Sequence, residues 1–98
     1  MVDSCNQSEI DDALKELNKE FNGSWSIKEE KLHREFKFSD FVSAFGFMTR
    51  VAILAEKADH HPDWSNEYNS VVINLTTHEA NGLSKKDFEL AHKISKLT

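Results

Sequence analysis

Cysteine, proline and glycine are scarce in this sequence, with one, one and three copies among 98 residues. The single cysteine, Cys5, excludes an internal disulfide framework and is typical of a reducing compartment. So few proline and glycine residues leave little room for long loops, and no internal repeat or linker is visible. We therefore expect a single domain over residues 1–98, in which residues 1–7 are flexible.

An excess of positive charge and a membrane-length apolar run are also lacking. The chain has 12 Lys and Arg residues against 17 Asp and Glu residues, and no basic run that would follow a phosphate backbone. The acidic N-terminus has no apolar signal segment. The longest apolar stretch, residues 41–55, is interrupted by polar residues and falls short of the ~20 needed to span a membrane. We expect a soluble, intracellular protein, cytoplasmic with the nucleus as a second location, that binds neither nucleic acid directly nor membranes.

The first predicted helix covers residues 8–20, where apolar residues recur at helical spacing. Ser8 and Asp11 have the spacing of a variant capping box, in which each side chain accepts a backbone hydrogen bond from the other residue. Asn22-Gly23 then predicts the end of the helix, because glycine tolerates the left-handed conformation of a helix stop.

Two further helices have similar start signals. A long helix runs from a cap at Ser39-Asp40 to about Ala58 and is apolar around much of its circumference. We expect it to pack on a sheet and also against another chain. The last helix opens with a capping box formed by Ser84 and Asp87.

The strands are short and follow one another in pairs. A strand begins near residue 25, turns at residues 29–30 and is followed by a half-buried strand at 31–38. Two more, near residues 63–69 and 71–77, form an antiparallel hairpin. One face of the second strand carries Leu32, Arg34, Phe36 and Phe38. The order α-β-β-α-β-β-α predicts an α+β fold.

Three of the five histidines are candidates for acid–base chemistry. Pro62 disfavours a helical conformation of the residue before it, so His60 and His61 lie at a helix-to-strand corner. We expect His78 on the last strand, which the hairpin returns towards that corner, so that three imidazoles line one cleft. Imidazole changes protonation at about pH 6.5, close to neutrality. Two imidazoles that face one substrate can therefore divide the work, one as acid and the other as base.

Two carboxylates near this corner favour a positive charge on His60. Glu56 lies one helical turn before His60 and Asp59 lies beside it, at a helix C-terminus that already carries a partial negative charge. We expect the protonated form of His60 to be favoured, which suits a general acid.

Other interpretations of the same residues stay open. A His-His-Pro corner alone is commonly a solvated turn, and histidines also bind metals, although no HExxH motif is present and Cys5 is remote. Asp87 is explained more simply as a helix cap than as a catalyst. Trp64 and Tyr68 alternate on one strand face, where core packing accounts for them as well as ring stacking does.

The segment Glu56-Lys57-Ala58-Asp59-His60-His61-Pro62-Asp63-Trp64 narrows these alternatives. It resembles the signature of the pterin-4a-carbinolamine dehydratases: an acid, His-His-Pro, an aromatic residue, and a further histidine sixteen residues after the proline. That histidine is His78, within the run Thr76-Thr77-His78-Glu79, followed by Gly82-Leu83-Ser84 and Asp87. The run from Phe45 to Ala52 is similar to the family's long helix, and the resemblance covers roughly residues 8–97.

The resemblance implies a fold and an assembly. Members of this family have a four-stranded antiparallel sheet with three helices on one face, in agreement with the order of elements above. They form dimers through the sheet and tetramers through the long helices, so a homo-oligomer is expected here. Some animal relatives also stabilise the dimer of a homeodomain transcription factor.

The resemblance also implies a reaction and a site. The expected reaction converts 4a-hydroxytetrahydrobiopterin to quinonoid dihydrobiopterin and water, in tetrahydrobiopterin recycling, with no cofactor and no metal. Three groups of residues are implied. The catalytic and pterin-surrounding residues are His60, His61 and His78; Asp59, Pro62, Thr76, Thr77 and Glu79 help to bind the pterin; Glu56, Trp64 and Asp87 support the site.

Within this scheme, His60 is the principal acid–base residue and Glu56 orients or charges it. His61 and His78 then exchange protons or bind the pterin. The competing hypothesis is a non-catalytic interaction module that serves as a transcription-factor dimerisation cofactor. A third, a related assembly factor, should lack part of the histidine set, which this sequence retains.

Overall fold

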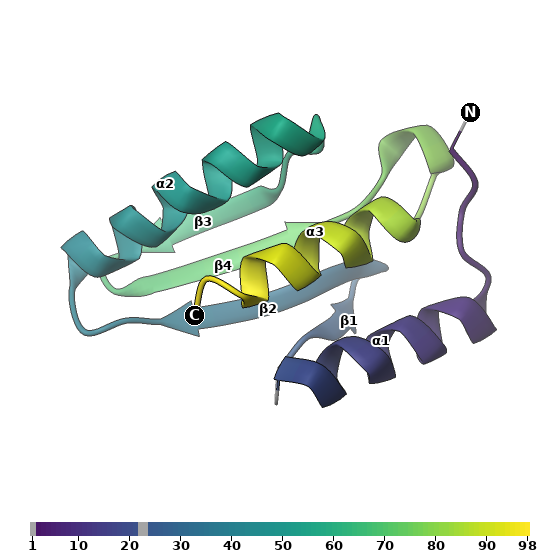
Figure 1. Cartoon of the computed structure of the whole chain (residues 1–98), viewed down its shortest axis with the longest axis horizontal. Helices are drawn as coiled ribbons and strands as arrows, with labels where there is room; N and C mark the ends of the chain where they lie inside the picture. The colour runs from purple at the N-terminus through teal and green to yellow at the C-terminus, as the bar shows by residue number, and fades with distance from the viewer. Residues whose placement is uncertain (1, 22–23) are drawn as a thin grey trace.

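The computed structural model describes residues 2–21 and 24–98, in which helices and strands follow one another in the predicted order (Figure 1). The helix stop predicted at Asn22-Gly23 lies outside the described residues. The bounds are α1 Gln7–Phe21, β1 Ser26–Lys28, β2 Lys31–Lys37, α2 Phe41–Ala58, β3 Asp63–Glu67, β4 Ser70–Leu75, the 3-10 helix η1 His78–Ala80, and α3 Lys85–Ser95.

The start of α1 differs from the predicted one. Asn6 and Glu9 form the capping box, because the Glu9 N–H donates to Asn6 Oδ1 and the Asn6 N–H donates to Glu9 Oε1, each at 2.8 Å. The predicted pair Ser8 and Asp11 is therefore wrong. Glutamate is the usual third-position partner in a capping box. The flexibility predicted for residues 1–7 stays a prediction, although the Cys5 N–H also donates to a carbonyl, that of Leu83, at 2.7 Å.

The predicted caps of the other two helices are confirmed. Asp40 accepts a hydrogen bond from the Ser43 N–H at 2.8 Å, and this bond lowers the pKa of the Asp40 carboxyl below its ordinary value. Ser84 and Asp87 form both bonds of a capping box at the start of α3. In both helices the side-chain oxygen satisfies an N–H that lacks a partner within the helix.

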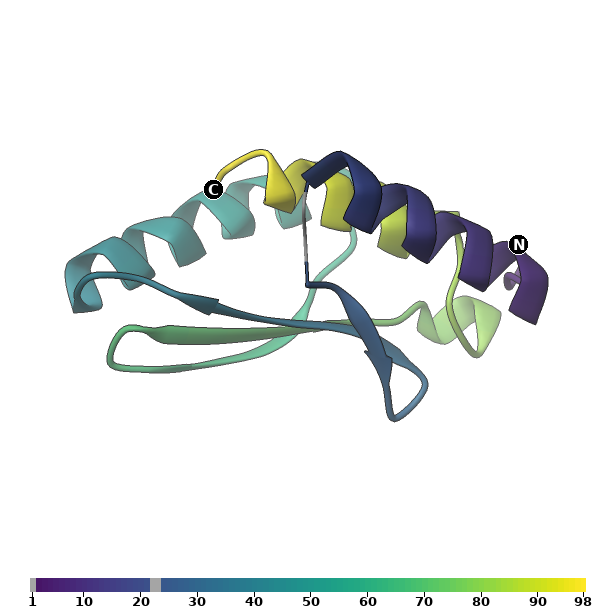
Figure 2. The same ribbon diagram turned by 90° about the horizontal axis from the view of Figure 1, so that it is seen from below.

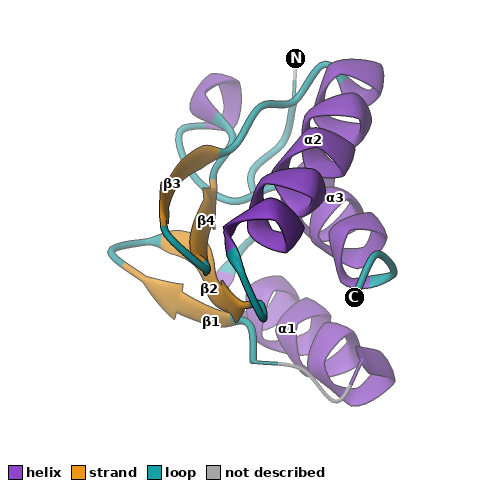
Figure 3. Ribbon diagram, turned by 90° about the vertical axis from the view of Figure 1, so that its left-hand side faces the viewer, coloured by secondary structure: helices purple, strands orange, loops and turns teal. Residues whose placement is uncertain are grey.

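The sheet is antiparallel throughout, with strand order β1-β2-β4-β3. Its central pair, β2 and β4, runs in register from Leu32 opposite Leu75 to Lys37 opposite Ser70. All three helices lie on one side of the sheet (Figures 2 and 3). Because strand residues alternate between the two faces, one face is apolar and buried under the helices and the other is polar. The predicted α+β architecture is confirmed.

The core lies between the sheet and the helices. Phe47 of α2 packs on Phe36 and Phe38, with ring centroids 4.8 and 4.9 Å apart. The Arg34 guanidinium lies 4.4 Å from the centroid of the Phe36 ring, and burial lowers the pKa of Arg34. The predicted apolar face of the second strand is therefore the one that faces the helices. The other buried apolar residues are Leu17, Trp25, Leu32, Ala44, Val51, Ala55, Val71, Ile73, Leu75, Leu83, Leu90, Ala91 and Ile94.

Two predicted strands end earlier than expected. β4 ends at Leu75, and His78 begins the short 3-10 helix η1, so the prediction that His78 lies on a strand is wrong. The Thr77 N–H and carbonyl both bond to Gly82, and this tight turn takes up the backbone groups that a longer strand would have paired. β3 ends at Glu67, which places Tyr68 in the hairpin turn rather than on a strand face with Trp64.

The outer surface of α2 is apolar and exposed. Its four large exposed hydrophobic residues are Phe41, Val42, Phe45 and Ile53, with Val42 78% exposed. One helix therefore has both a buried face and an uncovered apolar face, as its sequence predicts. In the described part of the chain, no helix has the length and hydropathy to cross a membrane.

Candidate active site

The corner between α2 and β3 separates the two adjacent histidines. The Asp59 N–H donates to the Glu56 carbonyl and the His60 N–H donates to the Ala55 carbonyl, at 3.2 and 3.0 Å. Together with the left-handed backbone of Asp59, at φ 51° and ψ 44°, these bonds form a Schellman motif. The chain reverses at this point. His60 is consequently buried, with 9% of its surface exposed, whereas His61 is exposed.

His60 is paired with Asp87 of α3. The distance from His60 Nε2 to Asp87 Oδ1 is 2.6 Å, and Asp87 has no exposed surface. The prediction that Glu56 orients His60 is therefore wrong. A residue one turn away faces its neighbour only while the helix continues, and His60 lies beyond the Schellman turn.

Glu56 instead contacts His61. The distance from Glu56 Oε1 to His61 Nε2 is 2.8 Å, and both side chains are largely exposed, at 82% and 59%. The corner thus holds two imidazole–carboxylate pairs in different surroundings, one buried and one in solvent.

The buried pair is part of a larger hydrogen-bond network. Asp87 Oδ2 accepts from the Thr77 hydroxyl at 2.8 Å and from the Ser84 N–H at 2.9 Å. The hydroxyl groups of Thr77 and Ser84 are 2.7 Å apart, and both residues are buried. The expectation that Asp87 caps α3 is confirmed, but this carboxylate also binds His60. Sequence reasoning missed Ser84 as a member of this network, because its cap position explained it fully.

The third histidine stands apart from the other two. His78 and the neighbouring Glu79 are exposed on η1, and they follow Thr77 directly. No hydrogen bond joins any two of the three candidate imidazoles within residues 2–21 and 24–98. The link between His78 and His60 runs through the backbone to Thr77 and from there to Asp87. A single cleft lined by all three rings stays a prediction.

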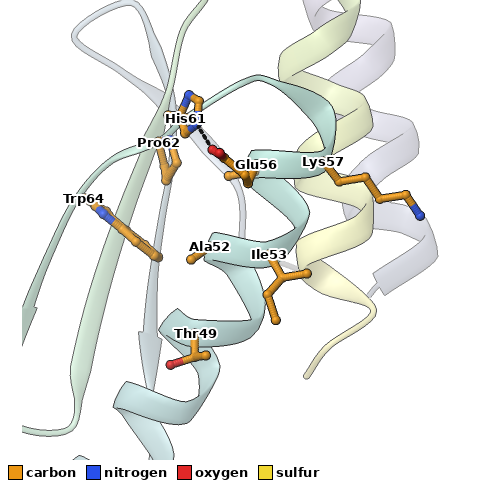
Figure 4. A pocket seen from close by; sticks show the side chains of 9 residues that line it. Thr49, Ala52, Ile53, Glu56, Lys57, His61, Pro62 and Trp64 are labelled. Carbon is orange, nitrogen blue, oxygen red and sulfur yellow. Dashed lines mark hydrogen bonds and ion pairs between the residues drawn. The ribbon is translucent and has the colours of Figure 1, made fainter.

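A hollow of about 640 Å³ opens beside the exposed pair (Figure 4). Trp64 and Pro62 form one wall, and Ala52 and Ile53 of α2 lie opposite them; the Glu56–His61 pair closes one end. Trp64 faces α2 because it pairs with the buried Ile73 in the sheet. The remaining residues that line the hollow are Thr49, Ala55 and Lys57. Largely apolar walls with one ionisable pair suit a flat ring that lies against the walls and carries polar atoms at its edge.

His60 opens onto a different and smaller hollow. That hollow has a volume of about 210 Å³ and is lined also by Lys86, Glu89 and Lys93 of α3. Of the other predicted binding residues, Asp59 lies in the corner itself, Thr76 directly follows β4, and Glu79 lies on η1. Across the two described ranges, 2–21 and 24–98, no three His, Cys, Asp or Glu side chains gather as ligands for a metal ion.

Comparisons with known proteins agree on one family. The fold is that of a small α+β domain, and one corner of it holds two imidazole–carboxylate pairs. The family model described as pterin 4 alpha carbinolamine dehydratase matches residues 3–97. The chain therefore belongs to the pterin-4a-carbinolamine dehydratase family.

Individual relatives cover nearly the whole chain. It is 48% identical over 97 residues to a Solibacter usitatus protein named "Putative pterin-4-alpha-carbinolamine dehydratase", covering 99% of this chain and 97% of that one. A Prochlorococcus marinus protein with the same name is 55% identical over 73 residues, covering 74% of this chain and 76% of the relative.

Two solved structures are also similar. One is described as a transcriptional coactivator/pterin dehydratase from Brucella melitensis, with a TM-score of 0.88, 40% identity, and coverage of 97% of this chain and 98% of that one. The other, a pterin dehydratase-like protein identified as a RuBisCO assembly factor in the alpha-carboxysome, has a TM-score of 0.67 and 20% identity. The match covers 79% of this chain and 92% of that one, and at this identity it shows the fold alone.

Proposed function

We propose that this protein dehydrates 4a-hydroxytetrahydrobiopterin to quinonoid dihydrobiopterin by histidine acid–base catalysis, and so serves tetrahydrobiopterin recycling in the cytoplasm. The observation that carries the proposal is the corner with two imidazole–carboxylate pairs, His60–Asp87 and Glu56–His61, at 2.6 and 2.8 Å. Membership of a dehydratase family supports the reaction class.

The chemistry requires two proton transfers and no change in oxidation state. The C4a–O bond breaks as the leaving hydroxide takes up a proton, and a second proton leaves the ring nitrogen N5. One positioned acid and one positioned base contribute on the order of 10²–10⁴-fold each. The two pairs supply different environments for these roles, since one imidazole is buried against a carboxylate and the other is exposed to solvent.

Each residue of the site then has a role that depends on where it lies. His60 is the principal acid–base residue, bound to Asp87, while His61 and His78 exchange protons with the pterin or bind it. The pterin lies at the corner that carries His60, His61 and Pro62, between the two hollows, and Asp59, Thr76 and Glu79 help to bind it. This arrangement needs no cofactor and no metal ion.

The test is stopped-flow absorbance of freshly generated 4a-hydroxytetrahydrobiopterin. The wild-type protein should accelerate its loss, and His60→Ala should lower kcat more than it raises KM. His92→Ala is the matched control, because His92 lies in the last turn of α3 and pairs with Glu20 of α1, with His92 Nε2 3.2 Å from Glu20 Oε2. Equal turnover by folded His60→Ala protein and the wild type would refute the assignment of His60.

The exposed apolar face of α2 favours a second activity, in which the protein binds other protein chains. A second copy of this chain is the partner we propose for that face, giving a homotetramer in which dimers formed through the sheet associate through α2. The edges of the sheet, β1 and β3, are available for the dimer contact. The Brucella protein's description as a transcriptional coactivator makes a transcription factor the alternative partner.

Light scattering with the Phe45→Glu variant tests this assembly. Phe45 is 55% exposed, so the folded monomer tolerates a charge there, whereas an α2–α2 contact does not. A tetrameric wild type and a dimeric variant are expected. A wild-type protein that does not self-associate, and that lacks dehydratase activity, would favour the non-catalytic interaction module.

A further inference from the structure

Thr77 has no polar group left for a ligand. Its side chain is 2% exposed, and its hydroxyl lies 2.8 Å from Asp87 Oδ2 and 2.7 Å from the Ser84 hydroxyl. Its N–H donates to the Gly82 carbonyl, and its carbonyl accepts from the N–H groups of Ala80 and Gly82. A residue whose donor and acceptors are all committed inside the protein is poorly suited to hydrogen-bond a substrate.

The direction of each hydrogen bond in the network follows from the donor inventory. The Ser84 N–H can only donate, so Asp87 Oδ2 is an acceptor. Thr77 has one hydroxyl proton, which it gives to the same oxygen, and it therefore accepts the proton of the Ser84 hydroxyl. Ser84 Oγ in turn accepts from the Lys86 N–H at 3.2 Å. The chain of donors runs in one direction and ends on the carboxylate.

His60 completes this chain from the other side. An ionised carboxylate only accepts, so the 2.6 Å contact requires a proton on His60 Nε2. Nδ1 is then the nitrogen on which the ring gains or loses a proton. A hydrogen bond at one ring nitrogen of a histidine commonly determines which nitrogen is available for chemistry.

We propose that Thr77, supported by Ser84, is a positioning residue that anchors Asp87 and thereby holds His60 in the Nε2–H form, and that its side chain does not contact the pterin. This assignment rests on the proposed function for its catalytic consequence and changes the binding role that the family resemblance implies for Thr77. The hydroxyl donor disperses the negative charge of Asp87. Removing the Thr77 hydroxyl leaves more of the Asp87 charge to stabilise a positive His60.

The critical comparison is Thr77→Val with Thr77→Ser. Valine has a similar volume but no hydroxyl, whereas serine keeps the donor. The kcat of Thr77→Val should fall on the order of tenfold with KM unchanged, and serine should restore it. Ser95→Ala, at the opposite end of α3, is the control for loss of a buried hydroxyl, since Ser95 accepts from Trp25 Nε1 at 2.8 Å.

The NMR titration of the His60 ring gives a readout that needs no substrate. Its midpoint should move to higher pH in Thr77→Val, return in Thr77→Ser and not change in Ser95→Ala. The other charged groups that share the His60 hollow or border it, Lys86, Glu89, Lys93 and Asp59, are the same in all these proteins. The shift therefore reports on the Asp87 carboxylate.

The outcomes separate this inference from the proposed function. An unchanged titration of His60 in folded Thr77→Val, or a raised KM with kcat unchanged, would overturn the positioning role. If the wild type has no dehydratase activity, the titration still decides whether Thr77 acts on His60. If Thr77→Val does not fold, the wild-type protein decides: slowly exchanging hydroxyl protons of Thr77 and Ser84 are expected, and rapid exchange of both would refute the network.

Discussion

Replacing Asp87 with asparagine should reverse the tautomer of His60. Asparagine has nearly the same shape as aspartate but one acceptor oxygen and one NH2 donor. The Ser84 N–H and the Thr77 hydroxyl both donate towards the Oδ2 position, at 2.9 and 2.8 Å, so the amide oxygen must take that place. The NH2 group then points at His60 Nε2, which has to become an acceptor, and the ring proton moves to Nδ1.

The expected loss in kcat follows from the acid–base group that the change of tautomer removes. If Nδ1 exchanges a proton with the pterin, the altered ring presents that nitrogen in the wrong state. The loss in kcat should then equal the contribution of one acid–base group, on the order of 10²–10⁴-fold, with little change in KM. The capping geometry of α3 survives because the oxygen still accepts the Ser84 N–H. The exchange of charged for neutral hydrogen bonds costs about 1–3 kcal/mol of folding stability.

Stopped-flow turnover and 15N NMR of the histidine rings measure the two effects separately. In the wild type at alkaline pH, the protonated ring nitrogen of His60 should be Nε2, and in Asp87→Asn it should be Nδ1. Asp11→Asn on α1 is the matched control, because it makes the same chemical change at an exposed site. A folded Asp87→Asn protein with wild-type kcat, or with the proton still on Nε2, would refute the reasoning.

Two further predictions concern helix ends. Asp59→Gly should raise the free energy of unfolding by about 1 kcal/mol, because a non-glycine residue in the left-handed conformation is strained. It should also raise KM if the Asp59 carboxylate binds the pterin. Chemical denaturation and steady-state kinetics measure the two effects, and an equal or lower stability would contradict the conformational argument. Asp40 stabilises α2 above its unfolded-state pKa of 3.8, and because the Ser43 N–H lowers its folded-state pKa, this contribution is lost as pH falls through that lower value. Asp40→Asn should therefore show a weaker loss of stability as the pH falls below about 4, measured by denaturation at each pH. An unchanged acid profile would show that the cap charge has no effect.

The fold was predictable where local signals act alone. The long apolar helix α2 and the Ser84–Asp87 capping box are set by residues within a few positions of one another, and both are present as predicted. The start of α1 was misplaced because Asn6 and Ser8 are both good caps, and the two bonds between Asn6 and Glu9 decide between them. The early end of β4 depends on the Thr77–Gly82 turn, for which the dipeptide Asn81-Gly82 was the local sign.

The site was less predictable than the fold. The three histidines were identified from their chemistry and from a family resemblance, but the partner of His60 was misassigned. Asp87 lies 27 positions further along the chain, and its contact with His60 depends on how α3 packs against the end of α2. The Schellman turn that directs His60 inward has Asp59 rather than glycine at its left-handed residue, so the usual sequence sign of such a turn is missing.

Because Asp87 has two roles, the His60–Asp87 pair persists only as long as the first turn of α3 stays formed. The same carboxylate closes the first turn of α3 and accepts the His60 proton, so fraying of that turn and disassembly of the pair are one event. Local opening of a helix end costs less free energy than global unfolding. The His60–Asp87 pair on which the proposed catalysis depends therefore exists only while this turn is closed, and amide hydrogen exchange at Lys86 and Asp87 reports how often the turn opens.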